Sequence, residues 1–361
     1  MPIRWRKEWI SDERYEAVGV FDVDGDGVMD IVSGAYWYQG PEFRQKYFIG
    51  EVMACGEYYD DFSVIPIDVN RDGRMDFITG GWFGKRLVWK ENPGKPGELW
   101  KVHLIAETGN IETTRAWDLD GDGYLEIIPN TPGSSWVKVW KLCEKKQNNF
   151  EERLIYSFPS DETQGHGLGA GDIAGNGRTD LVLAKGWLEA PEDCWAGKWR
   201  WHPEFDLGRA SIPILVVDVD GDGLSDLIVG QAHDYGLTWW QQCRNGSRRF
   251  WKPHPIDPFN AQYHDLAWAD IDGDGQGELI AGKRHRAHCG KDPGEFDDYG
   301  IYYFKWTGES FSKQVICYGK MGETKGCGIQ MALADLRGIG RLDLIAPGKD
   351  GLYVFFNEGT V

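Results

Sequence analysis

Seven segments of the chain place acidic side chains at alternating positions. The full pattern reads Asp-x-Asp-Gly-Asp-Gly-x-x-Asp before an apolar run, and its copies start at Asp22, Asp68, Asp118, Asp172, Asp218, Asp270 and Asp335. Alternating oxygen ligands, glycines that allow a sharp turn and a closing carboxylate suit a hard cation such as calcium, which takes roughly six to eight oxygen ligands. We therefore predict structural calcium loops.

Five of the seven loops carry a complete ligand set. The predicted metal ligands are Asp22, Asp24, Asp26, Asp30, Asp68, Asn70, Asp72, Asp76, Asp118, Asp120, Asp122, Glu126, Asp218, Asp220, Asp222, Asp226, Asp270, Asp272, Asp274 and Glu278. The fourth loop has Ala174 at a ligand position. The seventh has Arg337 and Ile339, and there we expect the guanidinium to replace the metal charge. An EF-hand is excluded because the twelfth loop position holds no glutamate and β-type sequence follows.

A second group of reactive side chains lies outside the acidic loops. Five of the eight histidines fall in short polar segments between the apolar runs, and these are His166, His233, His264, His285 and His288. Lysine, arginine, tyrosine and tryptophan gather in the same segments. Such a set can perform β-elimination, which needs a base for the proton next to a carbonyl or carboxylate, positive charge or a metal for the enolate, and an acid for the leaving oxygen.

We assign roles to these residues as hypotheses. The catalytic set is His166 and His264 as base and acid or as metal ligands, Lys185, Lys283 and Arg284 for the developing charge, and Tyr263 as an alternative proton donor. The substrate-binding set is Trp82 and Trp187, whose faces can stack on a sugar ring, with Arg86, Arg115, His233 and His285. A second divalent metal held by these histidines is a further alternative, because neutral imidazole is a common ligand.

The spacing of the acidic loops indicates the elements that position these residues. The loops recur every 46 to 65 residues, a period typical of propeller blades. Each period reads as four short antiparallel strands: an inner strand before the loop, as in 214–218, a second after it, as in 226–230, an aromatic third, as in 237–240, and a fourth, as in 100–105. We predict an all-β fold, a seven-bladed β-propeller formed by residues 1–361.

The two ends of the chain are predicted to complete one blade. The seventh period stops after its third strand, 352–356, whereas Trp5-Arg-Lys-Glu-Trp-Ile10 has the aromatic-x-x-x-x-Ile signature of a fourth strand. Met1–Ile10 should therefore supply the outer strand of the last blade, close the ring and remove its free edge. The acidic loops then lie on one face, and the histidine-rich segments lie around the axis on the other.

Composition restricts the classes of partner. The net charge is −18, yet 23 of the 57 acids lie in the seven loops, which leaves 34 acids against 39 Lys and Arg. An anionic ligand is therefore compatible with the remaining surface, and nucleic acid is not indicated. No apolar run suits a membrane span and the N-terminus has no signal-peptide core, so we expect a cytoplasmic protein or a secreted one without its leader. The seven scattered cysteines are expected to be buried thiols.

These repeats resemble the FG-GAP/VCBS family, whose calcium-loop blades also occur in integrin heads, and the resemblance covers essentially the whole chain. It implies a propeller with structural calcium. A second, local resemblance rests on Gly165–Asp172, Lys185–Trp187, Tyr263–Asp265, Gly282–His285 and Asp292–Glu295. These segments are similar to the propeller of aldos-2-ulose dehydratase and to seven-bladed polysaccharide lyases of the rhamnose–glucuronate type, which implies a protein that acts on carbohydrate.

The leading expectation is a carbon–oxygen lyase or dehydratase that acts by β-elimination on a keto-sugar or a uronate-containing glycoside. Its partner would be a carbohydrate or a sugar-derived small molecule. Two alternatives stay open. One is a non-catalytic propeller that binds carbohydrate or protein. The other is a glycoside hydrolase, which needs two carboxylates about 5–10 Å apart, and Asp60, Asp61, Asp234 and Asp265 are available for it. The sequence indicates no oligomeric state.

Overall fold

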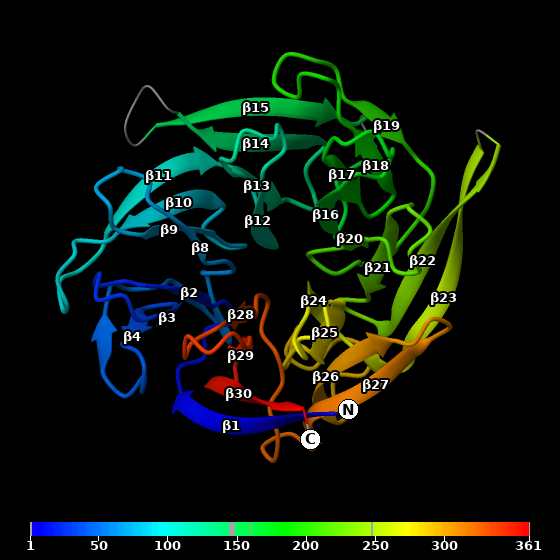
Figure 1. Cartoon of the computed structure of the whole chain (residues 1–361). Helices are drawn as coiled ribbons and strands as arrows, with labels where there is room; N and C mark the ends of the chain where they lie inside the picture. Colours follow the sequence, from blue (N-terminus) through cyan, green and yellow to red (C-terminus); the bar gives the residue numbers. More distant parts are fainter. Residues whose placement is uncertain (1, 144–148, 160, 247, 361) are drawn as a thin grey trace.

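The computed structural model describes residues 2–143, 149–159, 161–246 and 248–360, so Met1 of the predicted first strand lies outside the described residues. Within these ranges the strands form seven four-stranded sheets and one two-stranded ribbon. The sheets are arranged as blades around a central axis (Figure 1). The predicted all-β, seven-bladed propeller is confirmed. In the described part of the chain, no helix has the length and apolar character needed to cross a membrane.

Four strands build each blade, ordered from the axis outward. The first three blades are β2 (Gly19–Phe21), β3 (Asp30–Ser33), β4 (Tyr36–Tyr38) and β5 (Lys46–Phe48); β8 (Ile65–Ile67), β9 (Asp76–Gly80), β10 (Arg86–Glu91) and β11 (Lys101–Glu107); and β12 (Thr113–Trp117), β13 (Glu126–Asn130), β14 (Trp136–Leu142) and β15 (Phe150–Ser157). The ribbon of β6 (Ala54–Cys55) and β7 (Tyr58–Tyr59) precedes the second blade.

The remaining blades follow the same order. They are β16 (Leu168–Gly171), β17 (Asp180–Leu183), β18 (Gly186–Glu189) and β19 (Arg200–His202); β20 (Leu215–Val217), β21 (Asp226–Gly230), β22 (Tyr235–Asn245) and β23 (Arg248–Ala261); β24 (Tyr263–Ala269), β25 (Glu278–Lys283), β26 (Tyr299–Trp306) and β27 (Phe311–Gly319); and β28 (Ala332–Ala334), β29 (Asp343–Ala346), β30 (Leu352–Thr360) and β1 (Ile3–Ser11).

The seventh blade is closed by the first strand of the chain. β1 pairs antiparallel with β30, with Arg6 opposite Phe356, and Figure 1 shows the two termini side by side. The Ile3 backbone N–H also donates to the Tyr303 hydroxyl of the sixth blade at 2.9 Å. The predicted closure is therefore confirmed, and it leaves β30 without a free edge.

Apolar clusters fill the spaces between blades, and histidines outside the predicted rim contribute to this packing. The imidazole of His103 stacks on Trp89 at 4.2 Å, and that of His202 stacks on Trp187 at the same distance. His254 stacks in the same way on the third-strand tryptophan of its own blade. Described cysteines are all free thiols, but only Cys194 and Cys327 are buried and Cys55 is exposed, so the expectation of buried thiols holds in part.

The acidic loops join the first and second strands of the blades. In the first loop, Asp22 Oδ1 accepts the Gly25 N–H at 2.7 Å and Oδ2 accepts the Gly27 N–H at 2.8 Å, which fixes the turn. Carboxylate oxygens of Asp22, Asp24 and Asp30 lie within 4.8 Å of one another, so this loop fits a divalent cation. In the seventh loop, Arg337 Nη2 lies 2.9 Å from Asp343 Oδ1, where the sequence predicted a guanidinium in place of the metal charge.

Deleting residues 1–11 tests how far closure stabilises the ring. Loss of β1 uncovers the edge of β30 and removes the buried Ile3, so we expect a loss of unfolding free energy of at least about 3 kcal/mol and self-association through the free edge. Urea unfolding and size-exclusion chromatography measure both effects. The control Trp9→Thr changes a half-exposed side chain of the same strand and should change neither. A deletion variant as stable and monomeric as the parent would contradict the closing role.

Candidate functional site

The starts of three inner strands and one turn bring four side chains together. Glu112 directly precedes β12, His166 lies two residues before β16, His264 is the second residue of β24, and His233 follows β21. The acidic loops follow the opposite ends of the inner strands, so this group lies on the other face of the ring, as the sequence predicted. We call Glu112, His166, His233 and His264 the axial cluster.

One polar atom from each side chain of the axial cluster lies close to those of the other three. The four atoms lie within 4.8 Å of one another. Glu112 Oε1 is 3.0 Å from His264 Nε2, 3.5 Å from His166 Nε2 and 4.0 Å from His233 Nε2. The Nε2 atoms of His166 and His233 are 3.1 Å apart. Three imidazole nitrogens and one carboxylate oxygen therefore converge.

Hydrogen bonds on the far side of two rings locate their protons. His166 Nδ1 is 2.7 Å from the Ala210 carbonyl oxygen, and His233 Nδ1 is 2.9 Å from Asp292 Oδ2. Neither oxygen donates, so both Nδ1 atoms carry a proton, and the neutral form of either ring has its lone pair at Nε2. Two lone pairs 3.1 Å apart repel each other unless a proton or a metal cation lies between them. The donor set fits a metal ion, because metal-binding histidines usually donate their other N–H to a carbonyl or carboxylate.

Asp292 links the axial cluster to a second histidine. Its Oδ1 atom is 2.8 Å from His288 Nδ1, and the rings of His233 and His288 stack at 4.1 Å with an angle of 3°. The side chain of His288 is 40% exposed, whereas that of His233 is 2% exposed. The carboxylate therefore holds the Nδ1 proton of both rings, and the lone pair of neutral His288 is at Nε2.

Unusual backbone conformations position two of the histidines. Gly165 and Gly167 flank His166 with φ values of 75° and 143°, and a Cβ on Gly167 would lie 2.8 Å from the Ala210 Cβ. Gln262, two residues before His264, has φ of 61°, which costs energy for a residue with a Cβ. Strained backbone of this kind is concentrated at binding and catalytic sites.

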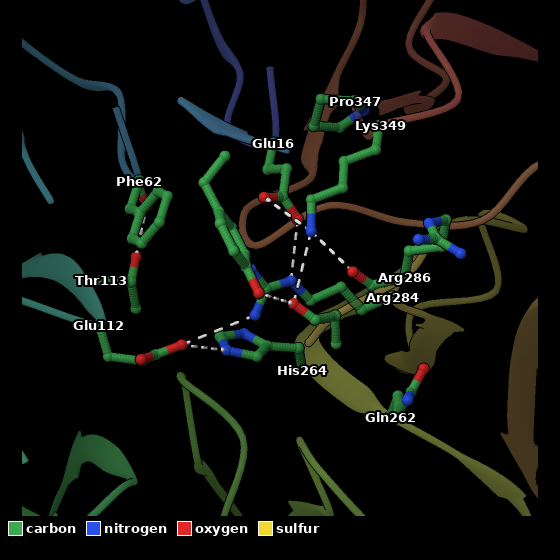
Figure 2. A network of polar contacts seen from close by, with 12 residues as sticks. Glu16, Phe62, Glu112, Thr113, Gln262, His264, Arg284, Arg286, Pro347 and Lys349 are labelled. Carbon is green, nitrogen blue, oxygen red and sulfur yellow. Dashed lines mark hydrogen bonds and ion pairs between the residues drawn. The ribbon is translucent and has the colours of Figure 1, made fainter. Parts of the chain in front are cut away.

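Figure 2 shows that Glu112 connects the axial cluster to a buried ion-pair network. Arg284 Nη1 is 3.6 Å from Glu112 Oε1, and Arg284 Nε donates to Glu16 Oε1 at 2.9 Å. Lys349 Nζ lies 3.7 Å from the other oxygen of Glu16. All four side chains are buried, so water screens their charges weakly. Two carboxylates and two cations balance one another beside the histidines.

Burial and neighbouring charges set the protonation of the cluster. Burial would raise the pKa of Glu112, but the His166 and His264 imidazoles outweigh it and hold that pKa well below its usual range. Burial lowers the pKa of His264 well below its usual value, and the charge of Arg284 lowers it further. Burial also lowers the pKa of His233 to about 4, although the hydrogen bond that His233 donates to Asp292 raises it. Glu112 is therefore ionised at neutral pH, and His233 and His264 are neutral. Because the ionised carboxylate can only accept, His264 Nε2 carries the proton of its ring, 3.0 Å from Glu112 Oε1, and a metal bound at this nitrogen would displace that proton.

A cavity of about 260 Å³ opens beside the axial cluster. Its walls are Tyr58, Phe62, Trp82, Phe83, Glu112, Arg284 and His288. Asp60 holds the turn that carries two of the aromatic walls, because its carboxylate accepts the N–H groups of Phe83 at 2.8 Å and Gly84 at 2.7 Å. A larger hollow of about 670 Å³ lies beside β1 and contains no member of the cluster. The small cavity combines aromatic faces with charged groups.

Five residues predicted for the site are found at it. These are His166, His233 and His264 in the axial cluster, Arg284 beside it and Trp82 on the cavity wall. They come from four different blades or blade connections, and their convergence follows from the closure of the ring.

Three predicted catalytic residues lie elsewhere. Tyr263 is fully buried, and its hydroxyl donates to Asp257 Oδ2 at 2.7 Å. Lys283 is 1% exposed and its Nζ donates to backbone carbonyls, among them that of Asp297 at 2.7 Å. We correct both assignments, because these groups are satisfied by structural hydrogen bonds away from the cluster. Lys185 is exposed in the turn between β17 and β18.

Four of the predicted substrate-binding residues lie away from the cavity beside the cluster. Trp187 is 1% exposed and lies between the stacked His202 ring and the guanidinium of Arg249, so it offers no face to a sugar. His285 stacks on Tyr299 at 4.6 Å. Arg115 donates to Asp265 Oδ1 at 2.6 Å and to a backbone carbonyl. Arg86 lies in a separate surface groove with Asp60. None of these four lines the cavity beside the cluster in the described part of the chain.

The carboxylates considered for hydrolysis have structural partners. Asp60 caps the turn described above, and Asp61 pairs with Lys90 at 3.3 Å. Asp265 holds Arg115 and accepts the Met331 N–H. Asp234 is exposed and accepts a neighbouring backbone N–H. The geometry therefore gives no support to a hydrolytic pair among them.

Sequence reasoning did not identify Glu112, Asp292 or His288 as site residues with a role. Glu112 is a single acid directly before a predicted inner-strand start. His166 and His264 also lie at the starts of inner strands. Asp292 lies in a loop, and the one histidine close to it in the sequence is His288, four residues earlier. The sequence alone does not show its contact with His233.

The depressed pKa of His233 predicts a pH-dependent stability. Folding lowers this pKa from about 6.5 to about 4, so the unfolded chain binds the proton more tightly and stability is lost as the pH falls below about 6.5. In chelator, the excess unfolding free energy of the parent over His233→Gln should shrink by about 2 kcal/mol between pH 7.5 and pH 5. Urea unfolding of both proteins at both pH values measures this difference. A gap that does not change with pH would show that His233 is not buried and neutral.

A comparison with known families agrees with the repeats of the chain. Residues 68–129 and 218–281 match the family described as FG-GAP-like repeat. Cartilage acidic protein 1 of Xenopus tropicalis is 29% identical over 140 residues, which cover 36% of this chain and 21% of that protein. The match thus spans about a fifth of the length of this relative.

Two solved structures are similar only at a low level. A luciferin-regenerating enzyme aligns with a TM-score of 0.46 and 13% identity over 91% of this chain and 99% of that chain. The Photorhabdus luminescens Tc holotoxin pore aligns with a TM-score of 0.37 and 16% identity over 94% of this chain and 16% of that chain. Neither likeness bears on function. The repeats and the sheet topology together identify the chain as a seven-bladed β-propeller that carries FG-GAP-like repeats.

Proposed function

We propose that this propeller is a metal-dependent carbon–oxygen lyase or dehydratase that acts by β-elimination on a keto-sugar or a uronate-containing glycoside. The observation that carries the proposal is the convergence of Nε2 of His166, His233 and His264 on Glu112 Oε1, with the Nε2 atoms of His166 and His233 3.1 Å apart. A contact this short between two ring nitrogens requires a proton or a metal cation between them. Glu112, which also faces Arg284, would be the carboxylate ligand of such a metal.

The donor set favours a transition metal at the axial cluster. Three imidazole nitrogens and one carboxylate suit zinc or another divalent first-row ion better than calcium, which prefers oxygen ligands. A metal held there would act as a Lewis acid on the substrate oxygen that becomes negatively charged when the neighbouring proton leaves. The sequence left two roles open for His166 and His264, either base and acid or metal ligands. This proposal takes them as metal ligands.

Other side chains of the cavity would move the protons. His288 lines the cavity, and Asp292 holds its Nδ1 proton, so its Nε2 can take the proton next to the carbonyl or carboxylate. Tyr58 lies on the cavity wall, and its hydroxyl donates to the Ala287 carbonyl at 2.9 Å, so it would have to exchange this bond for one to the leaving oxygen in order to protonate it. Arg284 adds positive charge beside Glu112 and orients that carboxylate.

The cavity walls support a sugar as the substrate class. Trp82 and Phe83 offer apolar ring faces, and stacking on such faces is a usual mode of sugar binding. The volume of about 260 Å³ is just below the range of about 300–1,000 Å³ typical of small-molecule sites, so it suits one small sugar unit. The polar hydroxyl groups would face Glu112, Arg284 and His288.

Glutamine variants of the cluster test the proposal. His166→Gln and His264→Gln each remove one nitrogen ligand, so we expect loss of about one bound transition-metal ion per chain and at least a roughly 100-fold fall in turnover. Elemental analysis measures the metal, and absorbance of the unsaturated product measures turnover on keto-sugars and uronate glycosides. His285→Gln is the matched control, because this rim histidine stacks on Tyr299 outside the cluster.

Three outcomes would contradict the proposal. Full metal content and turnover in both cluster variants would exclude the site. A reducing sugar without an unsaturated product would indicate hydrolysis. Saturable sugar binding by the metal-loaded parent without any turnover would indicate a binding propeller.

A further inference from the structure

One position of the third strand faces the acidic loop in every blade. It lies opposite the closing acid of the loop: Glu126 is directly paired with Lys141, and the registers of the other blades place their closing acids in the same way. In chain order the residues at this position are Gln39, Glu91, Lys141, Glu189, Gln241, Lys305 and Phe356. The seven blades therefore differ in the side chain opposite the closing acid. In the first, third, fifth and sixth blades this side chain contacts the loop, whereas Glu189 of the fourth blade binds Arg200 and His202.

Lysine occupies this position in the third and sixth blades. Lys141 Nζ lies 2.6 Å from Asp120 Oδ2, 2.7 Å from Asp122 Oδ2 and 2.9 Å from Glu126 Oε1. In the sixth blade, Lys305 Nζ contacts Asp272 and lies 2.6 Å from Asp274 and 3.3 Å from Glu278. Each ammonium thus donates to two carboxylates of its loop and forms an ion pair with the closing glutamate. These carboxylates are the ones that the sequence assigned to calcium.

Glutamine occupies the same position in the first and fifth blades. Gln39 Nε2 donates to Asp24 Oδ2 at 2.8 Å, and Gln241 Nε2 donates to Asp220 Oδ2 at 2.6 Å. An amide carries no charge, so the four carboxylates of each of these loops lack a compensating cation at this position. Mutual repulsion of such groups is relieved by a bound cation.

The closing acid changes together with this position. The two loops with lysine close with Glu126 and Glu278, and the other five loops close with aspartate. Asp30 gives both oxygens to backbone N–H groups, those of Val23 and Gly40, each at 2.8 Å. Glu126 and Glu278 give one oxygen to the backbone, and the longer side chain brings the other to the lysine. The same pair of changes in two separate blades indicates one structural device.

We infer that Lys141 and Lys305 are built-in cations that take the place of the divalent ion in the third and sixth loops, so that these loops stay metal-free while those starting at Asp22 and Asp218 bind the ion. A calcium ion needs the carboxylate oxygens that the ammonium already holds. The lysine also removes the dependence of these two blades on the calcium concentration. This inference goes beyond the proposed function and does not depend on the axial cluster.

Replacing each lysine by the glutamine of the first and fifth blades tests the inference. Lys141→Gln and Lys305→Gln should each bind one more calcium ion per chain than the parent, and the double variant two more. Equilibrium dialysis with radioactive calcium counts the ions on the full chain. In chelator the variants should melt at a lower temperature than the parent. Addition of calcium should raise their melting temperature back to that of the parent. A stoichiometry equal to that of the parent in both folded variants overturns the inference.

The opposite substitution, lysine for glutamine, keeps the test decisive if the lysine-to-glutamine variants fail to fold. Gln241→Lys combined with Asp226→Glu builds the lysine arrangement into the fifth loop and should remove one calcium ion per chain while the protein stays folded in chelator. Retention of the full calcium stoichiometry in this variant also overturns the inference. His285→Gln, which touches no acidic loop, should leave the calcium stoichiometry unchanged.

Discussion

The antiparallel pairing of β1 with β30 determines the geometry of the whole molecule, because it forces seven sheets to share one axis. Each inner strand then begins on the same face, near the same line. Side chains that are far apart in sequence, such as Glu112 and His264, meet there at 3.0 Å without any local motif that joins them. The site is a product of ring closure, and its precision depends on the packing between blades.

The two faces of the ring compensate the negative charge of carboxylates with different groups. On one face, acidic turns place carboxylates side by side and need a cation, which is a lysine in two blades and a guanidinium in the seventh. On the other face, three histidines surround one buried, ionised carboxylate, Glu112. Oxygen-rich turns favour a hard ion and nitrogen-rich clusters a transition metal, so one chain can keep two metals apart.

The periodic features could be predicted from the sequence, because each repeat encodes its own turn, its own strands and its own closing acid. The histidines of the site were predicted from the repeat as well, because inner-strand starts, which carry His166 and His264, and turns after second strands, one of which carries His233, lie on the same face. The errors came from neighbours in sequence. Tyr263 and His264 are successive residues of β24 and point to opposite faces, so only His264 reaches the cluster. Lys283 ends β25 and donates to backbone carbonyls, whereas Arg284, directly after the strand, reaches Glu112. Glu112 was missed because a single acid carries no pattern, and its meaning depends on contacts between blades.

The central claim is that the axial cluster holds a transition metal through three nitrogens and one oxygen. Cobalt(II) gives the most direct measurement, because its visible absorption reports the number and kind of its ligands. We predict that the chelated protein takes up one cobalt(II) ion per chain with intense visible bands from a four- or five-coordinate site, and that His233→Gln loses these bands. Absence of such bands at stoichiometric cobalt, or bands that are unchanged in His233→Gln, would contradict the account.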